Sequence, residues 1–375
     1  MAERGHPVWA EVDLGAITAN ARALVASVGR AEVMGVVKGY AYGHGNPASA
    51  NAILAGGATR LGVARVAEAL HLREAGIGVP IHVFTEPPPE AAATLISHDL
   101  IPTIYTDPFA RALDEAARAA GKRVPFHLKI DTGMHRVGLM VSDLPSALEA
   151  LGSYVGLELE GAWSHLAVAD EPDHPFTRKQ LDLFVEVTES IERAGYPLRY
   201  RHIANSAATL SMPDAHLDMV RCGIACFGLS PGDIASPMEL RPALALRARA
   251  NMIKEVPAGE ALSYGLQYEL KRSGRVVTVP AGYADGYSRA FSGKADVLIG
   301  GIRYRLSGTV CMDQFMVDIG ADEAAIGDVV TLVGTDGDDA ITAEELARLS
   351  GTINYEITTR IPSRVPRIYI PDAKS

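Results

Sequence analysis

An alternation of short apolar runs with helix-forming segments, between Gly15 and Gly228, is the strongest constraint on the fold of this chain. Runs of this length, bounded by glycine and polar residues, predict buried strands. Eight of them follow one another: Val33–Val37, Arg60–Ala64, Pro80–Phe84, Ile101–Ile104, Phe126–Ile130, Leu157–Trp163, Tyr200–Ile203 and Met219–Gly223.

Ala- and Leu-rich segments between these runs have the composition and length of helices. They include Glu68–Glu74, Pro108–Ala120 and Lys179–Ala194, and several end in a glycine, as helix C-termini commonly do. The glycines are Gly29, Gly76, Gly121 and Gly195. A strand and a helix that alternate eight times in about 215 residues predict an α/β fold of the TIM (β/α)8 barrel type. A doubly wound open sheet gives the same alternation, and we favour the barrel because eight repeats close the sheet.

The pattern changes after about Pro237, where Val-, Thr- and Tyr-rich runs are separated by glycine turns. The Ile299–Ile302 segment, with two central glycines, predicts a tight hairpin. A short helix is expected near 343–349, and the segment Val8–Asp13 is expected to add a strand. Single cores rarely grow beyond about 250–300 residues, so we expect a barrel over residues 1–236 and a mainly antiparallel β domain over 237–375. The other expected strands are Arg275–Pro280, Ala295–Ile299, Ile302–Leu306, Gln314–Asp318 and Asp328–Val333.

Charge and cysteine content exclude several classes of protein. With 35 basic and 45 acidic residues, the net charge of 35 − 45 = −10 disfavours binding to nucleic acid. The three cysteines, Cys222, Cys226 and Cys311, form no CxxC pair, so neither a disulfide framework nor a metal site is expected. The N-terminus has no apolar export segment, and the chain has no apolar stretch long enough to span a membrane. We therefore expect a cytoplasmic globular protein.

Polar residues gather where the predicted barrel strands end, which is where barrel enzymes carry their active sites. They are Lys38, Lys129, Asp131, Arg136, His165, His202, Asn205, Ser206, Arg221 and Gly223. Lys38 follows an apolar strand, so desolvation should lower its pKa and make the amine nucleophilic. The alternative is a lysine that extends from the barrel rim into water.

Backbone N–H groups of the loop that starts at Gly223, with the hydroxyl of Ser206, could bind a phosphate monoester. Ordinary helix capping by Asn205 and Ser206 is the alternative explanation. Barrels often bind phosphate after the seventh and eighth strands. A lysine at the end of the first strand, together with an anion site after the seventh and eighth strands, suggests pyridoxal phosphate held covalently by the lysine.

The sequence resembles the alanine racemase family, of the fold-type III pyridoxal-phosphate enzymes, over its whole length. Eight motifs in order carry the resemblance: Val36–Gly45 (VVKGYAYGHG), Lys129–Gly138 (KIDTGMHRVG), His202–Ala207 (HIANSA), Val220–Ile224 (VRCGI), Ser263–Gly265 (SYG), Gly282–Gly286 (GYADG), Gly308–Gln314 (GTVCMDQ) and Ile353–Glu356 (INYE). One departure is Gly39-Tyr40, where relatives usually carry Ala-Asn or Ala-Asp after the lysine. It should reshape the turn without altering the lysine chemistry.

The resemblance implies a racemase that interconverts L-alanine and D-alanine with two bases, supplying D-alanine for peptidoglycan. Lys38 would carry the cofactor and act on one face of the substrate α-carbon. Tyr264, from the other subunit of a homodimer, would act on the opposite face. Both groups have ordinary pKa values near 10, so each needs apolar or positive surroundings to work near neutral pH.

The resemblance also implies the roles of the surrounding residues. Arg221 would face the pyridine nitrogen of the cofactor and leave it unprotonated, because a guanidinium cannot give up its proton, and His165 would hydrogen-bond Arg221. Substrate would contact Arg136 and, in the partner motif, Met312 and Asp313; Lys129 would be open to carbamylation. The phosphate-binding positions would be Tyr42, Asn205, Ser206, Gly223, Ile224 and Tyr355, and Tyr283, Tyr355 and Asp170 would narrow the entrance.

Other functions remain open on the sequence alone. A broad-spectrum or serine racemase is the nearest alternative. A barrel-type decarboxylase of basic amino acids also pairs a lysine with a C-terminal β domain, and Cys311 and Asp313 lie near the position of its cysteine-aspartate motif. Tyr264 and Arg221 favour racemisation. A cofactor-carrying protein without enzymatic activity is disfavoured, because a carrier needs no base on the opposite face.

Overall fold

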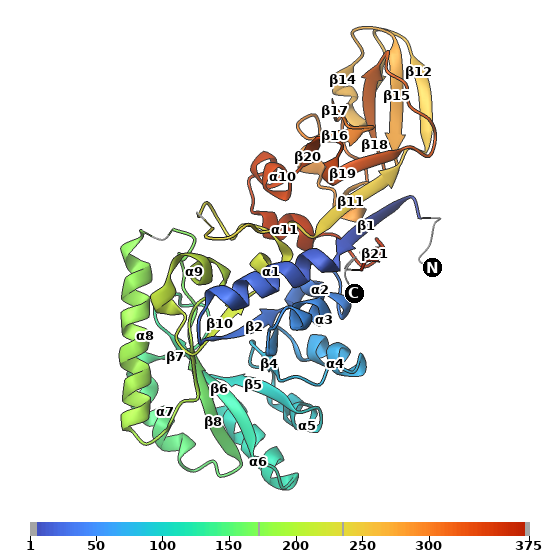
Figure 1. The fold of residues 1–375 in the computed structure, drawn as a ribbon. Helices are drawn as coiled ribbons and strands as arrows, with labels where there is room; N and C mark the ends of the chain where they lie inside the picture. The colour runs from blue at the N-terminus through green and yellow to red at the C-terminus, as the bar shows by residue number, and fades with distance from the viewer. Residues whose placement is uncertain (1–5, 172, 235, 372–375) are drawn as a thin grey trace. The chain divides into compact units, whose positions relative to one another are not determined.

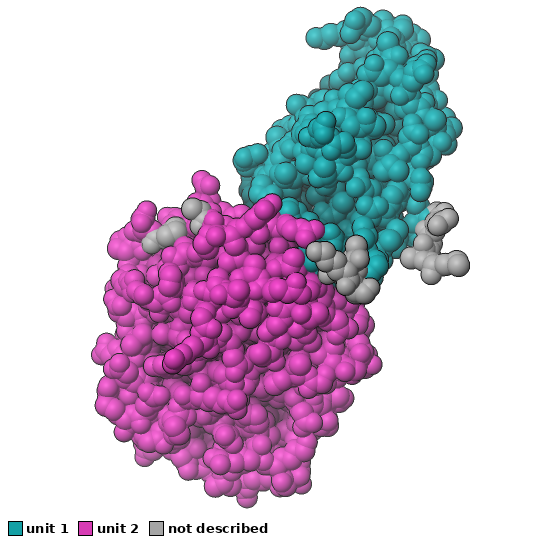
Figure 2. All heavy atoms as spheres, viewed as in Figure 1, with its two compact units in different colours: residues 1–16, 42–45, 242–375 teal, residues 17–41, 46–241 magenta. Residues whose placement is uncertain are grey.

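The structure, a computed structural model, describes residues 6–171, 173–234 and 236–371 of the chain. It divides into two compact units, drawn in different colours in Figure 2. The larger unit comprises residues 17–41 and 46–241, and the smaller comprises residues 1–16, 42–45 and 242–375. The division therefore falls at residue 241, where the sequence analysis placed a boundary at 236. It also assigns the four residues 42–45 to the smaller unit.

The larger unit is built on eight parallel strands in the order β10-β2-β3-β4-β5-β6-β8-β9 (Figure 1). They are β2 (Glu32–Val36), β3 (Arg60–Val63), β4 (Ile81–Val83), β5 (Leu100–Ile104), β6 (Val124–Asp131), β8 (Leu157–Trp163), β9 (Tyr200–His202) and β10 (Met219–Cys222). Two backbone hydrogen bonds link the ends of the order, from Asp218 to Arg201 and from Arg221 to Ala204. The sheet is thus a nearly closed barrel, which confirms the predicted TIM-type fold over an open sheet.

Helices follow the barrel strands, and the glycines predicted to end them do so. Gly29, Gly76, Gly121 and Gly195 all have positive φ, the conformation that helix C-termini need and glycine adopts without strain. In Figure 1 the long helix α8 runs on the outer side of the strands. The helices are α1 (Leu14–Ser27), α3 (Ala48–Ala55), α4 (Val66–Glu74), α5 (Ala92–Ser97), α6 (Asp107–Ala119), α7 (Leu144–Leu151), α8 (Pro175–Arg193) and α9 (Ser206–Ser211), and a short strand β7 (Leu139–Met140) pairs with β6.

The smaller unit is mainly antiparallel, as predicted. Its largest sheet has the order β17-β16-β19-β11-β1-β21, with β20 added to β19, and a second sheet has the order β12-β15-β18. The strands of these two sheets are β1 (Val8–Asp13), β11 (Leu244–Arg249), β12 (Met252–Val256), β15 (Gly274–Val279), β16 (Asp296–Ile299), β17 (Ile302–Arg305), β18 (Phe315–Gly320), β19 (Val329–Asp336), β20 (Asp339–Ile341) and β21 (Arg367–Ile370). Two further strands, β13 (Ala261–Leu262) and β14 (Tyr268–Glu269), pair with each other, and α10 (Ala343–Ser350) and α11 (Asn354–Thr359) are short helices.

Strand β1 lies between strands from the far end of the sequence. It pairs antiparallel with β11 and parallel with β21, so it lies within the larger sheet of the β-rich unit. The hairpin of β16 and β17 is also as expected: Ile299 pairs with Ile302, and Gly300 and Gly301 between them both have positive φ. Two-residue hairpins of this type require positive φ at both central positions.

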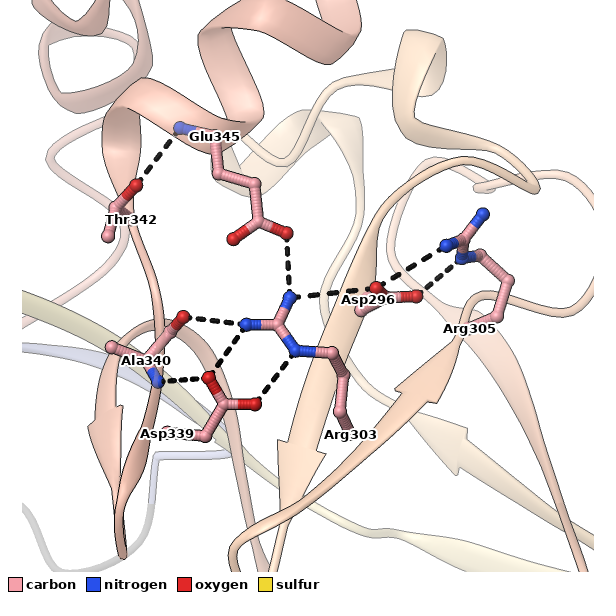
Figure 3. A network of polar contacts seen from close by, with 7 residues as sticks. All are labelled: Asp296, Arg303, Arg305, Asp339, Ala340, Thr342 and Glu345. Atoms are coloured by element: carbon pink, nitrogen blue, oxygen red, sulfur yellow. Dashed lines mark hydrogen bonds and ion pairs between the residues drawn. The ribbon is translucent and has the colours of Figure 1, made fainter.

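A network of charged side chains around Arg303 links the β16–β17 hairpin to α10 and β20 (Figure 3). Arg303 on β17 makes paired hydrogen bonds to the Asp339 carboxylate, at 2.8 and 2.9 Å, and one to Glu345 at 2.7 Å. A paired arginine–carboxylate contact is stronger and more directional than a single one, and it lowers the pKa of Asp339 to about 2. Thr342, whose hydroxyl accepts from the Glu345 N–H, starts α10 in the same place.

None of the helices in the described part of the chain is both long and apolar enough to cross a membrane.

Candidate functional site

Lys38 stands at the carboxyl end of β2, where the backbone makes a left-handed turn. Gly39, Tyr40, Ala41 and Tyr42 have φ between 53° and 62°, a conformation costly for residues other than glycine. The carboxylate of Glu68 holds the turn, since Oε1 accepts the Gly39 N–H at 2.7 Å. Its Oε2 accepts two further backbone N–H groups, from residues 64 and 65. The Gly39-Tyr40 departure therefore places a glycine first in this turn.

The surroundings of Lys38 favour its neutral amine. Burial lowers the pKa of the amine, and the nearby positive charges of Arg136 and Arg221 lower it further. Glu68 opposes these effects weakly, by favouring the ammonium form. A neutral amine is the nucleophilic form, so this lysine reacts with carbonyl groups at lower pH than an exposed one does.

Arg221, on β10, is buried and donates to acceptors on two segments of the barrel, at the ends of β8 and β9. Its Nη1 donates to the His202 carbonyl at 2.9 Å and its Nη2 to the Ser164 carbonyl at 2.9 Å. The same two nitrogens lie 3.2 Å from Nδ1 of His202 and Nδ1 of His165. Arg221 and His165, paired in the sequence analysis, are thus in contact, and so many acceptors hold the guanidinium in one orientation.

Lys129, on β6, is almost completely buried among cationic groups. Its amine donates to the Ile130 carbonyl at 3.2 Å and lies 4.5 Å from the centre of the Trp163 ring. Desolvation, with the charge of Arg221, lowers the pKa of Lys129 to about 7. Arg136 is exposed, yet its charge also contributes to this shift. Lys38, Lys129, Arg136 and Arg221 therefore form one basic region on the larger unit, in which the two arginines disfavour charge on the two lysines.

Hydrogen-bond donors suited to an anion lie at the ends of β9 and β10. Ser206 begins α9, and Asn205 caps that helix by accepting the Ala208 N–H at 3.0 Å. The Ser206 hydroxyl oxygen accepts the Gly223 N–H at 2.9 Å, which leaves its proton to donate elsewhere. Ile224 follows directly, in the short helix Ile224–Phe227. The structure thus brings Asn205, Ser206, Gly223 and Ile224 together.

Tyr264, Tyr283 and Met312 gather in the smaller unit. The Thr309 hydroxyl donates to the Tyr264 carbonyl at 2.9 Å, which joins the tyrosine segment to the loop that carries Met312. The Tyr283 N–H donates to the Cys311 carbonyl at 3.1 Å on the same loop. All three side chains are exposed, Tyr264 to 73%. The neighbouring Asp313 pairs with Arg364 at 2.7 Å.

The remaining predicted positions are divided between the two units. Tyr42 and Tyr355 belong to the smaller unit, with ring centres 6.0 Å apart. Asp170 is an exposed residue of the larger unit, beside Gly232, where an added Cβ would lie 2.7 Å from the Asp170 Cβ. Most of the predicted site residues on the barrel thus lie near Lys38 and Arg221. Those on the β-rich unit form one group around Tyr264 and a pair, Tyr42 and Tyr355.

Several polar residues of the barrel were not predicted from the sequence, above all His82, His127 and Glu160. The signal was present, since a histidine interrupts the apolar runs Pro80–Phe84 and Phe126–Ile130 at a buried position. A polar side chain facing a barrel core needs a partner to offset its desolvation. Nothing local to those runs identifies the partner, because it comes from another strand.

No group of three or more His, Cys, Asp or Glu side chains within residues 6–171, 173–234 and 236–371 is arranged to hold a metal ion. The groups present instead suit an organic anion that carries an aldehyde. They are the Lys38 amine, whose pKa is lowered, the Ser206 hydroxyl with neighbouring backbone N–H groups, and the Arg221 guanidinium, which is held in one orientation. These residues fit a phosphorylated pyridoxal cofactor.

Comparison with known proteins identifies the family. Residues 12–231 match the family described as alanine racemase, N-terminal domain, and residues 243–369 match alanine racemase, C-terminal domain. The chain is 44% identical to an alanine racemase of Carboxydothermus hydrogenoformans over 97% of this chain and 100% of that one. Its fold superposes on the alanine racemase of D-cycloserine-producing Streptomyces lavendulae with a TM-score of 0.94 and 42% identity, covering 98% of each chain. It superposes on a Bacillus anthracis alanine racemase with bound L-Ala-P at a TM-score of 0.93 and 40% identity, covering 98% of this chain and 96% of that one. The chain therefore belongs to the alanine racemase family.

Proposed function

We propose that this protein is a pyridoxal-phosphate-dependent alanine racemase that acts as a homodimer with shared active sites. The observation that carries the proposal is the environment of Lys38. Its amine is buried at a barrel strand end, and the charges of Arg136 and Arg221 add to the desolvation that lowers its pKa. In the cytoplasm, the D-alanine formed would serve peptidoglycan synthesis.

The residues that would hold the cofactor are those whose donors suit it. Lys38 would bind the aldehyde carbon, and the Ser206 hydroxyl, oriented by the Gly223 N–H that it accepts, would bind the phosphate together with the Ile224 N–H. Asn205, Tyr42 and Tyr355 would complete the phosphate site, and Arg221, held by His165, would contact the ring nitrogen. The chemistry that pyridoxal phosphate supplies when bound is an electron-withdrawing ring that acidifies the α-hydrogen of the linked amino acid.

Two residues would move the substrate proton, one from each subunit of the dimer. The neutral Lys38 amine of one subunit takes or returns a proton on one face of the α-carbon, and the Tyr264 hydroxyl of the other subunit does so on the opposite face. Racemisation needs a proton to leave one face and another to arrive at the opposite face, so two opposed groups perform it directly. Arg221 keeps its own proton at any working pH, so it stabilises charge without competing for the transferred proton.

Substrate binding would draw on both units. Arg136 suits a carboxylate because its planar fork can donate two parallel hydrogen bonds. The Met312 backbone N–H would bind the same carboxylate, Asp313 would contribute to substrate binding from the same motif, and Tyr283 would limit side-chain size. The exposed positions of Tyr264, Tyr283 and Met312 on one loop cluster support a dimer in which a second copy covers them.

The test is to incubate the purified holoenzyme with L-alanine in heavy water and to measure product handedness together with α-deuterium content. Racemisation should give D-alanine that carries α-deuterium. Release of carbon dioxide from lysine, ornithine or arginine without D-alanine would support a decarboxylase instead. Equal rates with serine and alanine would support a broad-spectrum racemase.

The assignment of Tyr264 has its own test. Tyr264→Phe should slow removal of the α-proton from one enantiomer far more than from the other. Tyr268→Phe, which removes a hydroxyl bonded to Asp318 at 2.8 Å in the same unit, is the matched control. Equal small losses for both enantiomers in Tyr264→Phe would contradict the two-base assignment, and full turnover by an isolated monomer would contradict the shared site.

A further inference from the structure

Polar side chains from all eight strands form a layer in the barrel, and all are buried except Glu160 and the partly exposed Glu32. Barrel interiors are ordinarily filled by bulky branched apolar residues, and polar groups there are costly unless they are hydrogen-bonded. From β2 to β10 the layer consists of Glu32, Arg60, His82, Thr103, His127, Glu160, His202 and Arg221.

Within this layer, a continuous chain of hydrogen bonds runs from Arg221 to Arg60. Arg221 Nη1 lies 3.2 Å from His202 Nδ1, and His202 Nε2 lies 2.7 Å from His127 Nδ1. His127 Nε2 lies 3.0 Å from Glu160 Oε2. The Glu160 carboxylate then accepts two hydrogen bonds from Arg60, at 3.0 and 3.2 Å.

The groups at the two ends of this hydrogen-bond chain determine which nitrogens of His127 and His202 carry a proton. An ionised carboxylate only accepts, so His127 must carry its proton on Nε2, facing Glu160. Burial lowers the pKa of both histidines, so each imidazole is neutral with a single N–H. His127 Nδ1 is then an acceptor, His202 must donate from Nε2, and His202 Nδ1 is left to accept from Arg221.

The opposite assignment of protons to the two imidazoles cannot satisfy all of these contacts. A proton on His127 Nδ1 would force His202 Nε2 to accept and would place a proton on His202 Nδ1. That proton would face the N–H of Arg221, which has no acceptor to offer. The contacts of Glu160 keep it ionised: its hydrogen bonds to His127 and Arg60 outweigh its burial and hold its pKa at about 2.

We propose that Glu160 is a positioning residue for Arg221, because its carboxylate fixes the tautomers of His127 and His202 and so keeps His202 Nδ1 as an acceptor for the guanidinium. Glu160 touches neither substrate nor cofactor and acts through the two imidazoles. The inference rests on the proposed function in one respect only, that Arg221 is the group at the cofactor ring.

The test compares two double variants that both remove the Arg60–Glu160 ion pair. Arg60→Met with Glu160→Gln keeps an acceptor for His127 Nε2, since the amide oxygen is no longer claimed by Arg60. Arg60→Met with Glu160→Met removes that acceptor and keeps a side chain of similar length. Imidazole 15N shifts of histidine-labelled holoenzyme report the tautomers, with signals assigned through His127→Gln and His202→Gln.

In the wild type and the glutamine double variant, His127 and His202 should both be Nε2–H tautomers. In the methionine double variant the tautomers should change, and kcat for alanine should fall about tenfold below that of the glutamine variant, with little change in KM. Unchanged tautomers and equal kcat in the two double variants would overturn the proposal. So would a wild-type spectrum with His127 doubly protonated or His202 protonated on Nδ1. Failure of the wild type to racemise alanine would refute the proposed function and leave the tautomer result standing.

Discussion

Replacing Lys129 by methionine should stabilise the folded chain, and the gain should shrink as the pH rises. The Lys129 side chain is 3% exposed, and its amine makes one hydrogen bond, to the Ile130 carbonyl. Arg221 and Arg136 add positive charge around it. Methionine keeps the unbranched stem and removes the charge that these surroundings disfavour.

The magnitude follows from two pKa values. In the folded chain the pKa of Lys129 is about 7, against 10.5 for an ordinary lysine. Between these values the unfolded chain holds a proton that the folded chain has lost, so the free energy of unfolding rises with pH. The full difference corresponds to about 5 kcal/mol, at about 1.4 kcal/mol per pKa unit. The advantage of Lys129→Met should therefore decrease by about 1.4 kcal/mol for each pH unit between pH 7.5 and 9.5.

The assay is urea unfolding of both proteins across this pH range, in buffer freed of carbon dioxide. Lys179→Met, at an exposed position of α8, is the control and should show little difference at any pH. A difference between wild type and Lys129→Met that stays constant from pH 7.5 to 9.5 would refute the reasoning.

Carbon dioxide should reverse this result. The neutral amine can attack carbon dioxide and lose a proton, which gives a carbamate anion that the nearby arginines would stabilise. Bicarbonate should then stabilise the wild type and leave Lys129→Met unaffected, and 13C-bicarbonate should give a carbamate NMR signal in the wild type only. Without that signal, the expected carbamylation of Lys129 is wrong.

Three other substitutions test the fold and the anion site. Gly161→Ala would place a Cβ 2.5 Å from the Tyr200 carbonyl oxygen. This clash should lower the free energy of unfolding by about 1–3 kcal/mol. A change below about 0.5 kcal/mol in urea unfolding would contradict the prediction. Ser206→Ala removes a hydroxyl from the proposed phosphate site. The dissociation constant for pyridoxal phosphate, measured by absorbance titration, should rise about tenfold. An unchanged dissociation constant would show that Ser206 does not bind the phosphate. Arg303→Met should lower the thermal midpoint by roughly 2–4 °C. This loss should exceed that of Arg305→Met, because Arg305 pairs with a single carboxylate. Equal midpoints for the two variants in a thermal scan would show that the wider Arg303 network adds no stability.

The barrel was predictable because its strands are read from local patterns. All eight predicted strands are present, and the four glycines end helices with the positive φ that their position requires. In the β-rich unit, β12 was missed because its side chains are mostly exposed and give no apolar run. β21 was missed because its neighbour in the sheet is β1, more than 350 residues earlier.

Candidate site residues could be proposed only where a residue stands at a strand end or in a recognisable motif. Lys38, Arg221 and Ser206 were proposed in that way, and the structure adds the contacts between Arg221 and His165 and between Ser206 and Gly223. Glu160 was not found, since its environment depends on His127 and on an arginine 100 residues earlier in the chain. Such pairings are set by the closure of the barrel and leave no local signature.

The position of β1 also bears on how the chain is made. The strand is synthesised well before its neighbours β11 and β21, which follow about 230 and 350 residues later. During that interval its backbone groups have no sheet to join, and unpaired strand edges are sites where other chains add. A product that stops before Arg367 would leave one side of Ala10–Asp13 open. We expect chains that terminate just before β21 to aggregate although their barrel is complete.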